Sequence, residues 1–260
     1  MVGNRKRRGI ARKTALARAL SKLGYCSRSR AAELIRAGRV SLNGKLRRDP
    51  ETPVAGTQGQ IAVDGKLVGA QKKIYWMMNK PRGVVTTAAD EKDRKTIYTL
   101  LSAGKNVQQE NAPWVAPVGR LDKASEGLLL LTNDSEWAAR IAAPETHLDK
   151  TYHVQLKAVA NDEFVRSLMH GVKTRDGEVL RAKQVRLLRA GEKNCWLEIV
   201  LDQGKNRQIR RMMEAMGVEV LRLLRVAIGP LQLGDLDKGE HRALTGDEKR
   251  GLDRAMPRKA

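Results

Sequence analysis

The sequence is poor in cysteine, histidine, aromatic residues and acids, and it lacks long apolar runs. Two cysteines and four histidines, none at a metal-ligand spacing, support neither a disulfide framework nor a zinc site. No apolar stretch approaches the roughly 20 residues of a membrane helix, and the basic N-terminus lacks the apolar segment of a secretory signal. We therefore expect a cytoplasmic protein without metal and without a membrane partner.

Sequence motifs for nucleotide cofactors are also missing. The chain contains no GxxxxGKS/T phosphate loop, and no GxGxxG segment follows a predicted strand. Any chemistry is therefore expected to come from side chains alone, without a cofactor.

The shortage of acids leaves a strongly basic chain. Its 50 Lys and Arg outnumber 29 Asp and Glu, which gives a net charge of +21 and a pI near 10.4. Such a balance predicts a polyanionic partner, while 41% hydrophobic residues suffice for a folded core. Fifteen of the basic residues and a single acid fall within residues 1–48, so the positive charge is concentrated at the N-terminus.

Residues 1–13 are predicted to form a disordered basic arm, and residues 14–72 a small folded module. The arm has no apolar periodicity, and it could contact phosphates or act only as a solubilising tail. In the module, leucines at helical spacing precede Gly24, and Ser27 is placed to cap a second helix that ends before Gly38. Asn43-Gly44 then predicts a hairpin.

One set of residues in this module is distinctive: LSKLGYCSR from Leu20 to Arg28, then Ala31, Ala32, Ile35, Gly38, Val40 and Asn43-Gly44-Lys45. The set resembles the alpha-L RNA-binding motif, which is named after a small-subunit ribosomal protein. The resemblance implies that the two helices present a basic face to structured RNA, although any one arginine alone would suit a solvated helix face. The RNA-binding residues expected on this basis are Arg28, Arg30, Arg36, Arg39 and Lys45.

Residues 73–250 are predicted to form a larger α+β domain with a mixed, mainly antiparallel sheet flanked by helices, and residues 251–260 a basic tail. Residues 151–156 and 195–201 alternate apolar and polar side chains as half-buried strands do. Asn161 or Asp162 is placed to cap a helix.

The start of this domain is predicted from a change in composition. The apolar residues 74–78 predict a strand, and the Pro and Gly of residues 79–83 predict a turn directly after it. A hydrophilic loop is expected at residues 88–95.

A first candidate site lies between Gly119 and Gly127. This loop contains Asp122 between Arg120 and Lys123, and two cations beside one acid would keep it ionised, as a nucleophilic carboxylate requires. A charged surface turn would have the same composition. Asp122 and Glu126 could also form a glycosidase-like carboxylate pair, although spacing in sequence does not give the distance between them.

A second candidate site precedes an amphipathic helix. Ile209, Met212, Met213 and Met216 follow helical spacing, and several arginines cluster in the first turns. Cations at a helix N-terminus oppose the helix dipole unless an anion or carboxylate lies there. The arginines could instead only solvate the helix.

Four motifs occur in order along the chain: NKPRG from Asn79, GRLD with SEGLL from Gly119, KTY from Lys150, and GKNRQIRRM from Gly204. In this order they resemble the bacterial ribosomal RNA pseudouridine synthases, in the branch with the small-subunit uridine enzyme and its large-subunit relatives. Together with the N-terminal module, the resemblance covers the chain from about Ala15 to Asp247.

The resemblance implies a role for individual residues. Asp122 matches the catalytic aspartate, Tyr152 the tyrosine that packs on the target uracil, and Arg210 the basic residue that pairs with the aspartate, a task that Arg207 could share. Ile209 matches the aliphatic residue beside the base. The residues expected to bind substrate are Arg120, Lys150, Lys205, Arg207 and Ile209.

The expected function is isomerisation of one uridine to pseudouridine in ribosomal RNA, preferably of the large subunit, within ribosomal assembly intermediates. The motifs leave open whether Asp122 attacks the anomeric carbon, which gives an acylal-type intermediate, or removes the 2′ proton, which gives a glycal. A monomer is expected. The alternatives are a non-enzymatic ribosomal RNA-binding or assembly protein, and a DNA-binding regulator that uses the helix after Ser27.

Overall fold

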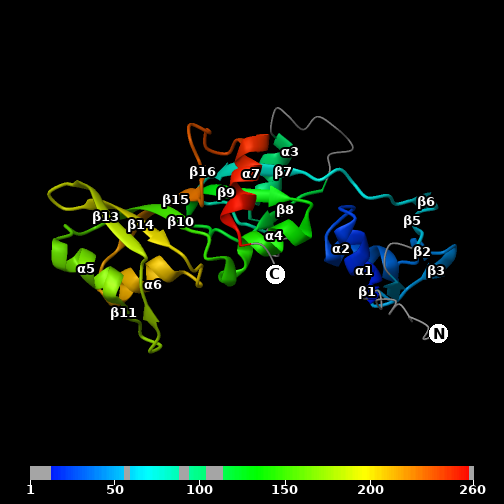
Figure 1. Ribbon diagram of the computed structural model, residues 1–260, viewed down its shortest axis with the longest axis horizontal. Helices are drawn as coiled ribbons and strands as arrows, with labels where there is room; N and C mark the ends of the chain where they lie inside the picture. The colour runs from blue at the N-terminus through cyan, green and yellow to red at the C-terminus, as the bar shows by residue number, and fades with distance from the viewer. Residues whose placement is uncertain (1–12, 56–58, 88–93, 104–113, 258–260) are drawn as a thin grey trace, which may run out of the picture. The chain divides into compact units, whose positions relative to one another are not determined.

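The computed structural model describes residues 13–55, 59–87, 94–103 and 114–257 (Figure 1). The chain divides into two compact units, one formed mainly by the residues up to Lys73 and the other mainly by the residues from Ile74. Apart from Lys13, the predicted basic arm lies outside the described residues. The same holds for the predicted loop at residues 88–95, apart from its last two residues.

The first unit follows the local signals of its sequence. Ser27 caps α2, since its side chain accepts a hydrogen bond of 3.1 Å from the backbone N–H of Arg30. Asn43 and Gly44 both have positive φ, at 52° and 77°, as a tight hairpin requires. The elements are β1 (Lys13–Ala15), α1 (Leu16–Lys22), α2 (Arg28–Arg36), β2 (Val40–Leu42), β3 (Lys45–Arg47), β4 (Pro53–Ala55), β5 (Ile61–Val63) and β6 (Lys66–Leu67). The predicted helices and hairpin of this unit are confirmed.

The second unit is built on a sheet with the strand order β13-β14-β10-β15-β9-β7-β17. β15 and β9 are parallel, and the other pairs of this sheet are antiparallel, so the mixed, mainly antiparallel sheet is confirmed. The strands are β7 (Tyr75–Lys80), β8 (Ala116–Val118), β9 (Glu126–Thr132), β10 (Lys150–Leu156), β11 (Val172–Lys173), β12 (Val179–Leu180), β13 (Gln184–Ala190), β14 (Cys195–Leu201), β15 (Val220–Ile228), β16 (Leu231–Gln232) and β17 (His241–Ala243).

Helices cover this sheet in two groups. One hydrophobic core joins α5 and α6 to β10, β13, β14 and β15, and a second joins α4 and α7 to β7, β8 and β9. The helices are α3 (Ile97–Ala103), α4 (Ser135–Ala142), α5 (Asp162–His170), α6 (Gln208–Ala215) and α7 (Gly246–Ala255), with a 3-10 turn η1 (Pro144–Thr146).

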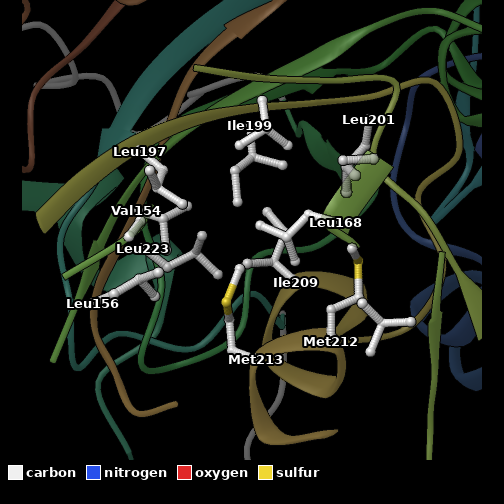
Figure 2. Close-up of a cluster of buried hydrophobic side chains, with 14 of the residues drawn as sticks. Val154, Leu156, Leu168, Leu197, Ile199, Leu201, Ile209, Met212, Met213 and Leu223 are labelled. Carbon is white, nitrogen blue, oxygen red and sulfur yellow. The ribbon is translucent and has the colours of Figure 1, made fainter. Parts of the chain in front are cut away.

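The core beneath α6 positions that helix against the strands. Figure 2 shows Ile209 and Met213 of α6 pointing toward Val154 and Leu223 of the sheet, and these side chains are at most 7% exposed. The predicted apolar face of this helix is therefore confirmed. Burying such side chains contributes about 1.5–3 kcal/mol each, so the first turn of α6 is held firmly over β10 and β15.

Two predictions in this unit are wrong in detail. Asn79 and Lys80 were expected in a turn, but they complete β7 because they pair with Leu128 and Gly127 of β9. The tail expected from residue 251 is the second half of α7 up to Ala255. A capping box at Thr245 and Glu248 starts this helix, and its buried Leu252 packs in the core.

Within the described part of the chain, no helix combines the length and the hydropathy needed to cross a membrane.

Candidate active site

A cavity of about 480 Å³ opens in the second unit between the sheet and the N-terminus of α6. Its walls come from the loop of residues 119–125, from β10 and β15, and from residues 203–209. Asp122, Tyr152 and Ile209 all line it. The two candidate segments of the sequence, whose Arg207 and Asp122 are 85 positions apart, therefore meet in one place.

Asp122 is held in its loop by backbone hydrogen bonds. Its carbonyl accepts from the N–H of Ser125 at 2.9 Å, and the neighbouring carbonyl of Leu121 accepts from the hydroxyl of Thr86 at 2.7 Å. Gly119 has a φ of 70°, which lets the chain turn sharply out of β8. The turn presents the Asp122 carboxylate to the cavity with 39% of the side chain exposed.

Lys80 anchors the same loop from beneath, a role that the sequence analysis did not assign. Its ammonium is fully buried and donates to the carbonyls of Pro81, Asp122 and Ser125 at 3.1, 3.2 and 2.8 Å. Burial lowers the pKa of Lys80 to about 8, while the charges of Asp122 and Glu126 act in the opposite direction. The available signal in the sequence was a lysine close after the apolar residues 74–78.

Arg207 lies closer to the Asp122 carboxylate than Arg210 does. Arg207 Nη1 is 3.4 Å from Asp122 Oδ2, whereas Arg210 Nη2 donates to the carbonyl of Ala124 at 2.9 Å. Burial, followed by the charge of Arg207, lowers the pKa of Arg210, and the charge of Asp122 raises it. The structure thus gives the two arginines different tasks: one faces the carboxylate and the other braces the loop.

Two of the positive charges at the start of α6, those of Lys205 and Arg211, have carboxylate partners from a nearby hairpin. Arg211 Nη2 lies 2.6 Å from Asp176 and 2.7 Å from Glu178, and Lys205 Nζ lies 2.8 Å from Glu178. Hydrogen bonds from Thr174 and then from Arg211 lower the pKa of Asp176 to about 2. These acids of the β11–β12 hairpin offset the charges of Arg211 and Lys205, and Asp122 lies beside Arg207, so carboxylates reduce the unfavourable arrangement expected at this helix N-terminus.

Glu126 does not form a carboxylate pair with Asp122 in the cavity. It is 3% exposed, and its oxygens lie 2.9 Å from Arg222 and 3.1 Å from Lys238. Burial alone would raise the pKa of Glu126, but the hydrogen bonds from Arg222 and Lys238 outweigh it and lower that pKa. The glycosidase-like pairing considered for these two acids is therefore not what the structure shows.

The remaining predicted substrate residues also reach the cavity. Arg120, Lys150, Lys205 and Arg207 line it together with Tyr152, whose ring is partly buried against the core under α6. Arg225 of β15 lines it too, and the sequence analysis missed it. Positions 223, 225 and 227 of β15 are buried, so Arg225 is a charged residue among the inward-facing positions of this strand. A charge at such a position is the signal that could have identified it.

In the first unit, the predicted RNA-binding residues are all exposed but not equivalent. Arg28 and Arg36 line a groove of about 700 Å³ along α1 and α2. Arg30 is paired with Glu33 at 3.0 Å, and Arg39 forms two hydrogen bonds with Asp64. Lys45 lies in the exposed hairpin after Gly44. Two of the five predicted RNA-binding cations, Arg30 and Arg39, therefore form ion pairs with acids of the same unit.

Among the described residues, no three His, Cys, Asp or Glu side chains lie together in a group that could hold a metal ion.

Comparison with known proteins identifies both units. The model of the RNA pseudouridylate synthase family matches residues 74–215, and the model of the S4 domain matches residues 16–56. The chain is 37% identical over 239 residues to "Ribosomal large subunit pseudouridine synthase B" of Bacillus subtilis, covering 91% of this chain and 94% of that protein. It is likewise 37% identical over 238 residues to an uncharacterized RNA pseudouridine synthase of Aquifex aeolicus, covering 91% and 92%.

A solved structure agrees with these matches. The crystal structure of a pseudouridylate synthase superposes with a TM-score of 0.61 and 28% sequence identity, over 92% of this chain and 99% of the other.

Proposed function

Because the chain belongs to the RNA pseudouridylate synthase family, we propose that it converts a uridine of ribosomal RNA into pseudouridine, with Asp122 as the catalytic carboxylate. The observation that carries this proposal is the shared cavity, in which the Asp122 carboxylate, the Tyr152 ring and the guanidinium of Arg207 meet. In the part of the chain that the structure describes, Asp122 is the only acid that lines this cavity.

The reaction needs what this cavity offers. It breaks the bond between C1′ and N1, turns the base, and joins C1′ to C5, with no change in oxidation state. The Asp122 carboxylate, which lies 3.4 Å from Arg207 Nη1, can attack C1′ or remove the 2′ proton. No part of this sequence of steps requires a second acid in the cavity.

The target uridine has to leave its helix to reach Asp122. Enzymes that act on a base extrude the nucleotide into a pocket, at a cost of a few kcal/mol for unstacking. We assign the Tyr152 ring to stacking on the extruded uracil, and the aliphatic Ile209 to the wall beside it. The exposed cations Arg120 and Arg207 then lie where the flanking phosphates can offset the cost.

Ribosomal RNA of the large subunit is the substrate that we propose. The name of the Bacillus subtilis relative refers to the large subunit, and identity extends over nine-tenths of both chains. The first unit adds an S4 domain whose exposed arginines suit a structured RNA. Ribosomal assembly intermediates, in which such RNA is still accessible, are the proposed partners.

Tritium release tests this proposal directly. Purified protein is incubated with large- and small-subunit ribosomal RNA transcripts labelled at carbon five of uridine, and we expect release from the large-subunit transcript. Asp122→Asn should bind this RNA with unchanged affinity and lower the rate by about 10⁴-fold or more. Asp235→Asn, an exposed acid outside the cavity, is the matched control and should keep full activity.

Three outcomes would contradict the proposal in different ways. Full activity of Asp122→Asn would remove the catalytic role of that residue. Release from the small-subunit transcript alone would change the substrate. Tight RNA binding without release from either transcript would favour a non-enzymatic RNA-binding protein.

A further inference from the structure

A single row of residues crosses the sheet, and its last two members, Arg225 and Tyr152, line the floor of the cavity. Lys80 of β7 pairs with Gly127 of β9, Gly127 with Arg225 of β15, and Arg225 with Tyr152 of β10. Directly paired residues point to the same face of a sheet. Arg225 therefore lies beside Tyr152 on the face that lines the cavity.

Arg225 is a buried cation with unused hydrogen-bonding capacity. Only 6% of the residue is exposed, and its Nε donates to the carbonyl of Leu128 at 2.7 Å. Its Nη2 is buried and has no hydrogen-bond partner in the part of the chain that the structure describes. A guanidinium stays charged in proteins, and a buried donor is normally paired, so this donor could take an acceptor that the described residues do not supply.

Lys150 adds a second cation to the same floor. It precedes Tyr152 by two residues on β10, so the two side chains share a face, and both line the cavity. Lys150 makes no hydrogen bond or ion pair through its side chain within the described ranges. Burial and then the charge of Arg225 lower the pKa of Lys150.

The acids nearest to Lys150 are engaged elsewhere. Asp149 lies 2.7 Å from Lys183, and Asp202 lies 3.6 Å from His147. The Asp122 carboxylate lies beside Arg207 on another wall. Asp149 and Asp202 are still near enough to raise the pKa of Lys150, but among the described residues no acid forms an ion pair with Lys150 or Arg225. Two neighbouring cations therefore line the cavity, which is unfavourable until negative charge arrives.

We propose that Lys150 and Arg225 bind the carbonyl oxygens of the extruded uracil and stabilise the negative charge that it carries once it is detached from the ribose. This inference rests on the proposed function. It extends that function by assigning a leaving-group site, with the uracil anion as its ligand.

The bond changes explain why negative charge develops there. When the C1′–N1 bond breaks, both of its electrons stay on N1, and resonance spreads the charge over O2 and O4. Asp122 forms an ester with C1′ or takes the 2′ proton, and either change is reversed later. C1′ then bonds to C5, the C5 proton leaves, and N1 takes up a proton, so that pseudouridine and uridine have the same atoms.

The depth of the site favours the base over a phosphate. Phosphates stay on the RNA strand and are bulky and hydrated, so the exposed Arg120 and Arg207 suit them. Arg225 is almost fully buried beside Tyr152, a depth that suits a planar base better than a hydrated phosphate. A fixed cation placed where charge develops acts mainly on the transition state.

Single-turnover kinetics test the inference. The rate constant of tritium release, the RNA dissociation constant and its salt dependence are measured for wild type, Lys150→Met, Lys150→Arg and Arg225→Gln. Lys150→Met should slow release by about 10²-fold, the usual effect of one lost charge-stabilising donor. Its RNA affinity and salt slope should stay unchanged, and Lys150→Arg should restore most of the rate. Arg225→Gln should slow release to a similar extent.

Lys157→Met serves as the matched control, because Lys157 follows the other end of β10 and is exposed beside Glu219. It should keep the wild-type rate. Thermal denaturation of every variant shows whether a slower rate reflects the lost charge or an unfolded protein. If Arg225→Gln does not fold, the two Lys150 variants alone test the inference.

Three results would overturn the inference. They are an unchanged rate for Lys150→Met, no recovery in Lys150→Arg, or weaker RNA binding with a lower salt slope at an unchanged rate, which would indicate a phosphate site. In each of these cases the wild-type protein still releases tritium, so the proposed function itself would stand. An inactive wild type would instead refute the proposed function.

Discussion

Arg207 and Asp122 are 85 positions apart in the chain, yet Arg207 Nη1 lies 3.4 Å from Asp122 Oδ2. Arg207 can face the loop because it precedes α6 in a left-handed conformation, with a φ of 47°. Such a conformation is uncommon for a residue other than glycine, and its strain is often associated with function. The contact joins the two candidate segments of the sequence.

Replacing either of the two arginines near Asp122 should have different effects on the reaction rate and on stability. Arg207→Met removes a half-exposed ion pair, so the free energy of unfolding should change by less than about 1 kcal/mol. Its rate of tritium release should fall by roughly tenfold, since a charge-assisted hydrogen bond to the carboxylate is lost. Arg210→Met should lower both rate and stability, because Ala124 then loses its donor. Kinetics combined with urea denaturation check this, and a stable, active Arg210→Met would contradict it.

The stability contributed by Lys80 should depend on pH. The pKa of Lys80 is about 8 in the folded protein and near 10.5 when unfolded, so between these values the unfolded chain binds the extra proton. The contribution of this group is therefore present above pH 10.5 and is lost as the pH falls through 8. We expect the difference in unfolding free energy between wild type and Lys80→Met to rise with pH, by at most ~1.4 kcal/mol per unit.

Urea denaturation of both proteins at pH 7.5, 8.5 and 9.5 measures this difference. Since Lys80→Met retains every other titrating group, a difference that stays flat across this range would show that the ammonium of Lys80 is not perturbed.

Gly127 should tolerate no side chain. Its φ is 104°, and a Cβ atom there would lie 2.3 Å from the backbone oxygen of Arg225, so the strands could not keep their pairing. Gly127→Ala should cost about 3 kcal/mol or more. Gly204→Ala is the control, because no atom of the described residues lies within 4 Å of its added Cβ, and it should change stability by less than about 0.5 kcal/mol. Equal melting temperatures of the two variants would contradict this.

The arginines of the first unit should contribute unequally to RNA binding. Arg28 and Arg36 line the groove, whereas Arg30 and Arg39 have to leave an acid before they meet a phosphate. We expect Arg28→Gln with Arg36→Gln to weaken binding and reduce the salt slope by about one for each lost phosphate contact. Arg30→Gln with Arg39→Gln should have a smaller effect on RNA affinity and on the salt slope. Filter-binding titrations at several salt concentrations measure both, and a larger effect of the second pair would contradict the assignment.

Local sequence signals predicted much of the fold correctly. The Ser27 cap, the Asn43-Gly44 hairpin and the alternating strand at 195–201 all depend on residues within a few positions of one another. The end of β7 did not follow from such signals. Lys80 is a strand residue because Gly127, 47 positions later, pairs with it, and this pairing outweighs the turn tendency of the neighbouring Pro and Gly.

The sequence by itself determined the basic surface, the helices and hairpins with clear caps and turns, and the order of the motifs that carry Asp122, Tyr152 and Arg210. Only the tertiary structure decided that Arg207 faces the carboxylate, that Lys80 supports its loop, and that Arg225 and Lys150 lie together beneath the cavity. The physical reason is that helix caps and turns are short-range interactions, whereas a charge acquires its partner, and its pKa, only when strands distant in sequence pair side by side.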